Sequence, residues 1–316
     1  MRTLPEGLRS TYLDFVENRH RVWEARQAGL PAPWSDDPVL QGHKFTNVFR
    51  VLDYGSQFLL SMLEEDLDER ETLARCFLYR HTGRPETWQF YEVLHGHYPR
   101  IEDFPELLET WKEYRGGTRR VTRNAGSAKA ADSYVFDRPI FTSAYLVFPQ
   151  SQVPGTDKLE SIIALATRLF GPEDVTPAWL ATSSPAERFR VLQRNPGVGD
   201  FMSMQILTDW GYSRFGADDE NRFVVPGPGA IKGAKALFPS WKPSEVIRWA
   251  RAELLTCPPV LPLPNGGERV PSLMDVQNTL CEFSKYVRFM VQEKNYTFTP
   301  AHPGAQPSPV VPSAYL

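Results

Sequence analysis

Hydrophobic residues recur every three or four positions through most of this chain, a period that is typical of amphipathic helices. Two short runs, Ser133–Phe136 and Ala144–Phe148, are instead β-like and stand between polar or proline-containing stretches. The sequence therefore predicts a mainly helical fold with a few short strands. The predicted helices cover about residues 10–28, 44–65, 69–80, 87–94, 104–114, 157–171, 185–194, 201–210 and 273–293.

The connections between these helices predict two lobes and a tail. We expect an N-terminal helical lobe over residues 1–150 and a second helical lobe over residues 151–298. A proline- and glycine-rich connection, residues 257–271 (CPPVLPLPNGGERVP), precedes the last helix of the second lobe. Residues 299–316 are rich in proline and predict an extended segment along the surface.

A Pro-Gly-hydrophobic-Gly turn, residues 195–201 (NPGVGDF), separates the predicted helices 185–194 and 201–210. It resembles the hairpin of the helix-hairpin-helix element, in which Gly197, Val198 and Gly199 would bring the backbone close to DNA. The second helix would point its unpaired N–H groups at a phosphate. A plain connection between two helices needs the same residue types, so both interpretations stay open.

Composition indicates an intracellular globular protein. The chain has 316 residues, 41% of them hydrophobic, and three widely spaced cysteines without a CxxC pair. This argues against a disulfide scaffold and a zinc site. No stretch approaches the roughly 20 apolar residues of a membrane span, and the first residues lack the apolar core of a signal peptide. We therefore expect a soluble, cytoplasmic protein with no membrane partner.

The net charge of −3 argues against non-specific coating of nucleic acid, but it allows a local basic face. One basic cluster surrounds Gly116-Gly117, in a segment that we expect to be a loop. Its side chains either contact phosphate or are simply solvated. Outside this cluster, Lys232 lies shortly after the turn GPGA and is a further candidate for contact with the DNA backbone. The basic cluster consists of Lys112, Arg115, Arg119, Arg120, Arg123 and Lys129.

Polar side chains with directional hydrogen bonding form a stripe along the predicted helix 44–65. Asn47, Arg50, Asp53 and Gln57 follow at steps of three or four, where an ordinary solvent face would carry mostly Lys and Glu. Such a stripe is either the wall of a polar pocket or a satisfied network between helices.

The last helix has a comparable polar stripe of Asp275, Asn278, Glu282 and Lys285. Ser272 is placed to cap this helix, and Asp275 at its N3 position then favours the helix dipole. Capping is therefore the preferred explanation of Asp275.

Asp209 lies near the C-terminus of the predicted helix 201–210, on the unfavourable side of the helix dipole. Trp210 and Tyr212 could shield it, and a residue that breaks a local rule can be present for function. The six histidines, including His95 and His97, form no metal-binding or catalytic motif. We therefore expect neither a metal nor a cofactor.

Several motifs in fixed order carry a resemblance to a known family. PWSDDPVL, FTNVFRVLD, RHTGRPETW, IFTSAY, PGVGDFMSMQILTDWGYS, VVPGPGAIKG and DVQNTLCEFSKYVR follow one another between Trp34 and Arg288. Together they resemble the α-glutamyl/putrescinyl thymine pyrophosphorylase family and the related helical domain of hydroxymethyluracil DNA kinases. That family is regarded as a distant relative of helix-hairpin-helix DNA glycosylases, which implies a two-lobed, glycosylase-like helical fold.

The resemblance also implies a set of site residues. Asp209, Asp53 and Asp275 are the candidate catalytic carboxylates, and Tyr145, within IFTSAY, is one candidate for base binding. Two features depart from the glycosylase pattern. Residues 224–227 (VVPG) carry no carboxylate where a catalytic Asp is usual, and Asp200 stands near the place of the lysine of bifunctional members. The other base-binding candidates are Asn47, Arg50, Gln57, Arg80, Glu282, Lys285 and Tyr286.

The leading hypothesis is a monofunctional DNA glycosylase that flips a bulky 5-modified pyrimidine, hypermodified or glucosylated, out of phage DNA and hydrolyses its N-glycosidic bond, in anti-phage defence. A carboxylate would stabilise the oxocarbenium-like transition state and orient water. The alternatives are a transferase that displaces pyrophosphate from a modified thymine in DNA, and a module that binds modified DNA without chemistry. The expected partner is double-stranded DNA, and we expect a monomer.

Overall fold

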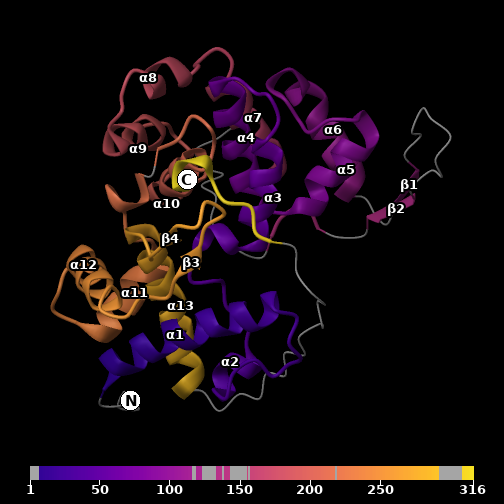
Figure 1. Ribbon diagram of the computed structural model, residues 1–316. Coiled ribbons are helices and arrows are strands. Elements are labelled where there is room, and N and C mark those ends of the chain that lie inside the picture. The colour runs from indigo at the N-terminus through magenta and orange to yellow at the C-terminus, as the bar shows by residue number, and fades with distance from the viewer. Residues whose placement is uncertain are drawn as a thin grey trace. The chain divides into compact units, whose positions relative to one another are not determined.

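The computed structural model describes residues 7–115, 119–122, 133–136, 139–142, 155, 157–217, 219–291 and 308–316, with backbone alone in 119–122 and 133–136. The described chain is mainly helical, which confirms the predicted class (Figure 1). It divides into two compact units. Unit 1 consists of Met1–Gln57 and Ala217–Leu316, and unit 2 of Phe58–Gly216. Among the helices in these ranges, none is long and apolar enough to cross a membrane.

Unit 1 is built around its last long helix, α13 (Leu273–Val291). The helices α1 (Leu8–Gln27), α2 (Pro38–Gly42), α11 (Pro228–Leu237) and α12 (Pro243–Leu254) pack against it. The remaining elements of the unit are η1 (Arg50–Leu52), the start of α3 (Tyr54–Leu63), η4 (Asp219–Asn221), η5 (Ser313–Tyr315) and the paired strands β3 (Leu261–Pro262) and β4 (Glu268–Arg269).

Two glycines explain how closely α11 approaches α13. A Cβ atom at Gly229 would overlap with the Cys281 side chain, and one at Gly233 would overlap with the Leu280 carbonyl. Glycine therefore lets the two backbones touch. The motif VVPGPGAIKG serves this helix packing, and Lys232 points from α11 as an exposed residue.

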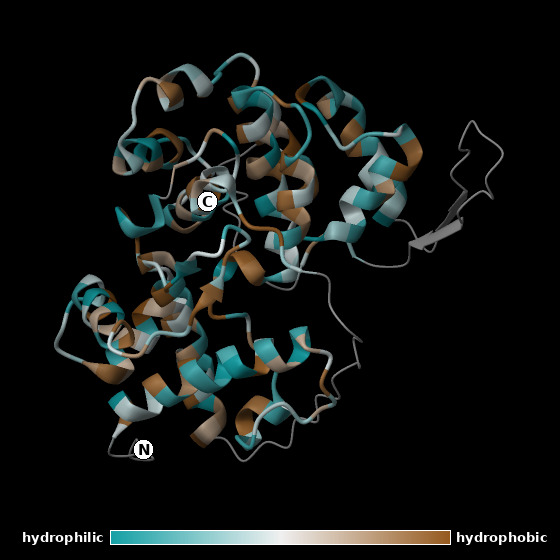
Figure 2. Cartoon of the chain, in the orientation of Figure 1, coloured by the Kyte–Doolittle hydropathy of each residue, from teal (hydrophilic) through white to brown (hydrophobic). Residues whose placement is uncertain are grey.

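Unit 2 is built around α4 (Glu69–Thr82), which is buried along residues 72–82 and packs on α10 (Asp200–Gly211). Four fully buried tryptophans, Trp88, Trp111, Trp179 and Trp210, fill its core. Figure 2 shows hydrophobic and hydrophilic residues alternating along the helices. The other elements are α5 (Pro85–His95), η2 (Ile101–Asp103), α6 (Phe104–Arg115), β1 (Arg119–Thr122), β2 (Ser133–Phe136), α7 (Lys158–Leu169), α8 (Thr176–Leu180) and α9 (Pro185–Gln193).

One predicted helix is wrong in its first half. Residues 44–49 are irregular, and a helix begins only with η1 and then α3. The Asn47 side chain donates to the Leu52 carbonyl at 2.6 Å, and Asp53 accepts from the Asn47 backbone N–H at 2.7 Å. Short polar side chains here compete with the helical backbone pattern, because they satisfy the backbone groups themselves. The predicted strand Ser133–Phe136 is confirmed as β2, whereas Ala144–Phe148 lies outside the described residues.

The compact units do not coincide with the lobes 1–150 and 151–298 that the sequence predicts. Tyr12 in α1 bonds Thr279 in α13 with 2.6 Å between the hydroxyl oxygens, so both ends of the chain contribute to one core. A contact between residues so far apart in sequence has no signature in local hydrophobic periodicity. The resemblance of the fold to DNA glycosylases stays a prediction.

Candidate functional site

The polar segment between α2 and α3 lies against one face of α13 in unit 1. The Arg50 backbone N–H donates to Asp275 Oδ1 at 2.8 Å, and the Thr46 N–H donates to Glu282 Oε2 at 3.2 Å. Asn278 Nδ2 donates to the Asn47 carbonyl at 3.2 Å. The two polar stripes that the sequence places on separate helices therefore meet. We call this group the segment–α13 site: Arg19, Asn47, Arg50, Asp53, Gln57, Asp275, Asn278, Glu282 and Lys285.

Asp53 has the ionisation behaviour expected of a working carboxylate. Burial raises the pKa of its carboxyl to about 7, although the Asn47 N–H and the charges of Arg19 and Arg50 act to lower it. The residue is half-buried, and the neighbouring Tyr54 is 68% exposed. Perturbed pKa values of this kind cluster at functional sites. Among the predicted catalytic carboxylates, Asp53 is therefore the one whose raised pKa best suits proton transfer.

Arg19 of α1 supplies a buried positive charge to this site and was not predicted from the sequence. It is 3% exposed, and its Nη2 donates to the Asn47 carbonyl at 3.0 Å. Its charge lowers the pKa of Asp53. The sequence signal for Arg19 was weak because one arginine on a long surface helix is ordinary; its burial comes only from packing.

Asp275 has a complete structural role. Its Oδ2 accepts from the Ser272 N–H and hydroxyl at 2.9 Å each, and its own N–H donates to Ser272 Oγ at 3.0 Å. This is the reciprocal capping arrangement that the sequence indicated. With the residue 2% exposed and Oδ1 bonded to the Arg50 N–H, Asp275 ties the irregular segment to the start of α13.

Three further predicted residues lie on α13 near residues 37–46. The Lys285 ammonium bonds the Lys44 carbonyl, lies 3.5 Å from Glu282 Oε2 and stands over the Phe45 ring. The Tyr286 hydroxyl donates to Asp37 Oδ2 at 2.7 Å, and burial raises its pKa. These contacts hold residues 37–46 against α13.

Gln57 is engaged by the C-terminal segment, residues 308–316. Its Nε2 donates to the Val310 carbonyl at 2.9 Å and to the Val51 carbonyl at 2.7 Å. Its Oε1 accepts from the Val310 N–H at 2.8 Å. A predicted base-reading amide is thus paired with backbone of the protein itself.

Three linked polar residues of unit 1 were not predicted from the sequence: the buried Glu220 and Arg269 and the half-buried Tyr315. Arg269 Nη2 donates to Glu220 Oε2 at 2.6 Å, and the Tyr315 hydroxyl donates to the same oxygen at 2.5 Å. Burial raises the pKa of Glu220 to about 7, with the nearby Asp275 charge acting in the same direction. The three residues lie in η4, β4 and η5, and no local pattern links such distant positions.

In unit 2, Arg80 and Asp209 form an ion pair through two hydrogen bonds. Arg80 Nε and Nη2 lie 2.6 Å from Asp209 Oδ2 and Oδ1 respectively, and the Asp209 side chain is 0% exposed. The carboxylate that breaks the helix-dipole rule is therefore explained by a buried arginine from α4. Both residues serve the interior of unit 2, and neither belongs to the segment–α13 site.

The predicted hairpin forms between α9 and α10. Gly197 has φ of 95°, the left-handed region that favours glycine, and Val198 is buried. Gly199 precedes α10 without a capping side chain, and a Cβ there would meet no atom within 4 Å. Arg168 Nη2 donates to the Pro196 carbonyl at 3.0 Å. The turn therefore presents open backbone at Gly199.

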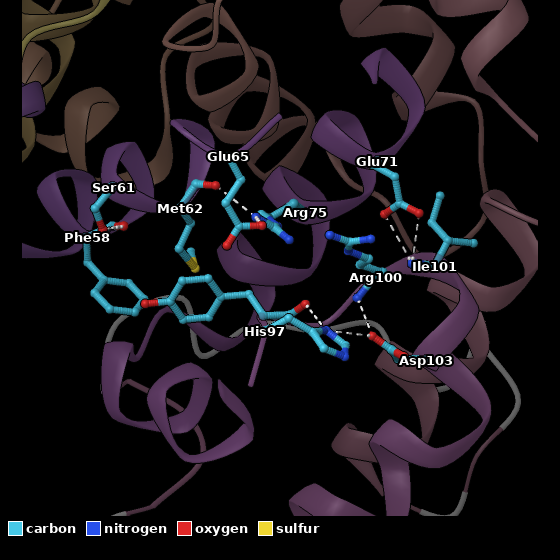
Figure 3. Close-up of polar contacts among 11 residues, drawn as sticks. Phe58, Ser61, Met62, Glu65, Glu71, Arg75, His97, Arg100, Ile101 and Asp103 are labelled. Atoms are coloured by element: carbon cyan, nitrogen blue, oxygen red, sulfur yellow. Dashed lines mark hydrogen bonds and ion pairs between the residues drawn. The ribbon is translucent and has the colours of Figure 1, made fainter. Parts of the chain in front are cut away.

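Unit 2 also contains a charged surface pocket of about 470 Å³. In Figure 3, Glu71 accepts from the Ile101 N–H, and Arg75 donates to Glu65 and to the Met62 carbonyl at 2.8 Å each. These contacts position one side of the pocket. The pocket is lined by Asp66, Leu67, Asp68, Glu71, Arg100, Glu102 and Arg214.

Some predicted residues have no described side chain. Arg119 and Arg120 lie on β1, where only backbone is described, and Arg123 and Tyr145 lie outside the described residues. Their proposed contacts with DNA stay predictions.

Comparisons with known proteins give the family context. Residues 6–296 match the family described as 5-hmdU DNA kinase, helical domain. The chain is 24% identical over 320 residues to a 5-hmdU DNA kinase of Bacillus phage SP10. The alignment covers 90% of this chain and 45% of the phage protein, so the chain spans about half the length of the curated relative that it matches. No solved structure matches the chain.

Proposed function

Since the chain belongs to the family of the 5-hmdU DNA kinase helical domain, we propose that it acts on DNA that carries a 5-modified pyrimidine. The ordered sequence motifs between Trp34 and Arg288 resemble the same helical domain, in agreement with this assignment. The pyrophosphorylase family stays a prediction.

We propose Asp53 as the acting carboxylate. A pKa of about 7 lets one group accept a proton near neutral pH, which is the property that a general base needs. Asn47 and Arg50 lie beside it in the same segment, and the exposed ring of Tyr54 follows directly in sequence. An exposed aromatic ring next to a base of this kind suits stacking on a pyrimidine.

For a DNA glycosylase, the target nucleotide would flip out of the duplex so that its sugar lies beside Asp53. The N1–C1′ bond breaks as positive charge develops on the sugar, and the carboxylate stabilises that charge. Asp53 then takes a proton from the water that attacks C1′, and N1 of the departing base, which keeps the electron pair of the broken bond, takes a proton from solvent. Hydrolysis needs no cofactor, and the reaction would leave a free base and an abasic site.

The alternative is a transfer reaction at the 5-substituent. It is favoured by the match to a domain of a longer kinase, of which this chain covers less than half. In that setting the segment–α13 site would hold the modified pyrimidine. Asp53 would accept the proton of a 5-hydroxymethyl group, while a separate part or partner would supply the phosphoryl group.

The hairpin supports DNA as the partner. Its backbone at Gly199 is open, and no side chain caps the start of α10. Such helix starts favour phosphate groups, although Asp200 in the first turn reduces the positive potential there. We therefore propose contact with the backbone and assign no base reading to the hairpin.

One experiment separates the reactions. The chain is incubated with duplexes that contain one 5-hydroxymethyluracil or one thymine, with and without ATP, and products are identified by mass spectrometry and alkaline cleavage. Free base with an abasic site supports the glycosylase. A phosphorylated base that requires ATP supports the transfer reaction. In a further incubation with an amine and a duplex that carries a pyrophosphorylated 5-hydroxymethyluracil, released pyrophosphate supports the transferase.

The Asp53→Asn variant tests the assigned residue. We expect at least a roughly 100-fold loss of product formation, the usual contribution of a general base, with DNA affinity retained. Asp36→Asn is the matched control because Asp36 is an exposed carboxylate in unit 1. Full activity of Asp53→Asn would exclude Asp53 from the chemistry. Binding without product on any DNA would leave the chain as a binding module.

A further inference from the structure

The ring of Tyr315 lies in a slot between two charged side chains of unit 1. The Arg269 guanidinium carbon is 3.5 Å from the ring centroid, and the Tyr315 hydroxyl donates to Glu220 Oε2 at 2.5 Å. A cation thus covers the face of the ring and a carboxylate accepts from its edge. We call this place the Arg269–Glu220 slot.

The walls of the slot are joined without the tyrosine. Arg269 Nη2 donates to Glu220 Oε2 at 2.6 Å, and both side chains are buried. Arg269 is further held by the pairing of β4 with β3, in which it lies opposite Leu261. A ring other than that of Tyr315 would meet the same guanidinium face and the same carboxylate.

The chemistry of these walls defines a class of ligand. Guanidinium planes stack on nucleobases as they do on aromatic side chains. In its ionised form, the Glu220 carboxylate selects a ring whose edge carries an N–H or O–H donor, because an acceptor there would place two lone pairs against each other. A pyrimidine with a ring N–H or a 5-hydroxymethyl group has the size of a phenol and supplies that donor.

We propose that the Arg269–Glu220 slot binds a pyrimidine ring with an N–H or O–H donor at its edge, and that Tyr315 occupies the slot until such a ring displaces it. The choice of a pyrimidine over other planar donor rings rests on the proposed function.

The segment that carries Tyr315 is lightly attached. Within residues 308–316, Pro312 is the one buried residue, and Leu316 is 62% exposed. Besides the contacts of Tyr315, the segment is held by the Gln57 amide on Val310 and by Asn265 Nδ2 on the Leu316 carbonyl. Displacement therefore exposes little hydrophobic surface.

Displacement also frees a predicted base-binding residue. Gln57 gives both ends of its amide to Val310, so the same movement that empties the slot releases Gln57 for a ligand. The charges of Asp275 and Arg50 act on Glu220, which links the slot electrostatically to the segment–α13 site. The slot therefore lies within electrostatic reach of the segment–α13 site in unit 1.

The test uses the full chain and a free nucleoside. Binding of 5-hydroxymethyl-2′-deoxyuridine is measured by ligand-observed NMR for the wild type, Tyr315→Ala, Tyr315→Phe and the exposed control Ser313→Ala. When Tyr315 fills the slot, the nucleoside cannot bind, so its apparent affinity falls in proportion to the fraction of molecules whose slot is open. We expect Tyr315→Ala to bind at least about tenfold more tightly than the wild type, Tyr315→Phe to fall between them, and Ser313→Ala to match the wild type.

Two additions make the result specific to the slot. Glu220→Gln in the Tyr315→Ala background should remove the gained affinity, and a peptide of residues 308–316 (SPVVPSAYL) should compete with the nucleoside. The proposal is overturned if Tyr315→Ala, shown to be folded by its thermal transition, binds the nucleoside no better than the wild type. It is also overturned if the gain persists with Glu220→Gln.

These outcomes are separable from the proposed function. Nucleoside binding gained by Tyr315→Ala, with no DNA processed by any variant, keeps the slot and removes the proposed function. DNA processed by the wild type, with no nucleoside bound by Tyr315→Ala, keeps the function and removes the slot.

Discussion

Arg80 and Asp209 pair through two hydrogen bonds of 2.6 Å inside unit 2, where the aspartate side chain is fully buried. A carboxylate in this position looks catalytic in the sequence because it opposes the dipole of its helix. The pairing gives it a different explanation, since a buried charge needs a partner more than it needs a favourable dipole.

The first prediction concerns stability. Asp209→Asn should lower the free energy of unfolding by about 3–5 kcal/mol, because it leaves the Arg80 charge buried without its counter-charge. The double variant Arg80→Met/Asp209→Leu should recover much of that loss, since apolar residues can replace a buried pair. Urea unfolding at pH 7 measures both. An Asp209→Asn protein of unchanged stability that lacks activity would instead make Asp209 catalytic.

The second prediction concerns Arg19. Its positive charge lowers the pKa of Asp53, so Arg19→Gln should raise that pKa above its value of about 7. The expected movement is about one unit, and NMR of the carboxyl carbon measures it directly. Arg21→Gln is the matched control, since Arg21 is an exposed arginine on the same helix, paired with Glu17. An unchanged Asp53 titration in Arg19→Gln would contradict the assigned coupling.

The third prediction concerns pH and stability. Burial raises the pKa of Glu220 from 4.5 to about 7, so the folded state holds this proton where the unfolded state has released it. Stability should therefore fall as pH rises from about 4.5 to about 7, by up to about 3 kcal/mol from this group. Glu220→Gln should flatten that part of the curve of unfolding free energy against pH. A slope as steep in the variant as in the wild type would refute the prediction.

The fourth prediction compares two glycines of the hairpin. Gly197→Ala should destabilise the protein by about 1 kcal/mol or more, because its φ of 95° strains any residue with a Cβ. Gly199→Val should cost at most about 1 kcal/mol, since nothing lies within 4 Å of a Cβ there and the expected penalty is that valine is a poorer N-cap than glycine. If the turn contacts DNA, Gly199→Val should weaken duplex binding in an anisotropy titration. Equal affinity with and without the valine would remove the hairpin from the interface.

The local chemistry of the chain was predictable where it depends on near neighbours. The helices 104–114 and 273–293, the Ser272 cap with Asp275 at N3, and the hairpin between two helices all follow from spacing and residue type. The irregular segment 44–49 was missed because its polar side chains bond their own backbone, which hydrophobic periodicity does not register.

By itself, the sequence determined the helical class, most helix positions and the cap at the start of α13, because these depend on periodicity and capping within a few residues. Only the tertiary structure decided which carboxylates are held in ion pairs or caps and which have a raised pKa. Arg80 lies 129 positions from Asp209, Asp275 lies 225 from Arg50, and Tyr315 lies 95 from Glu220. Burial and long-range partners set these contacts and the raised pKa of Glu220, and they exist only once distant segments share a core.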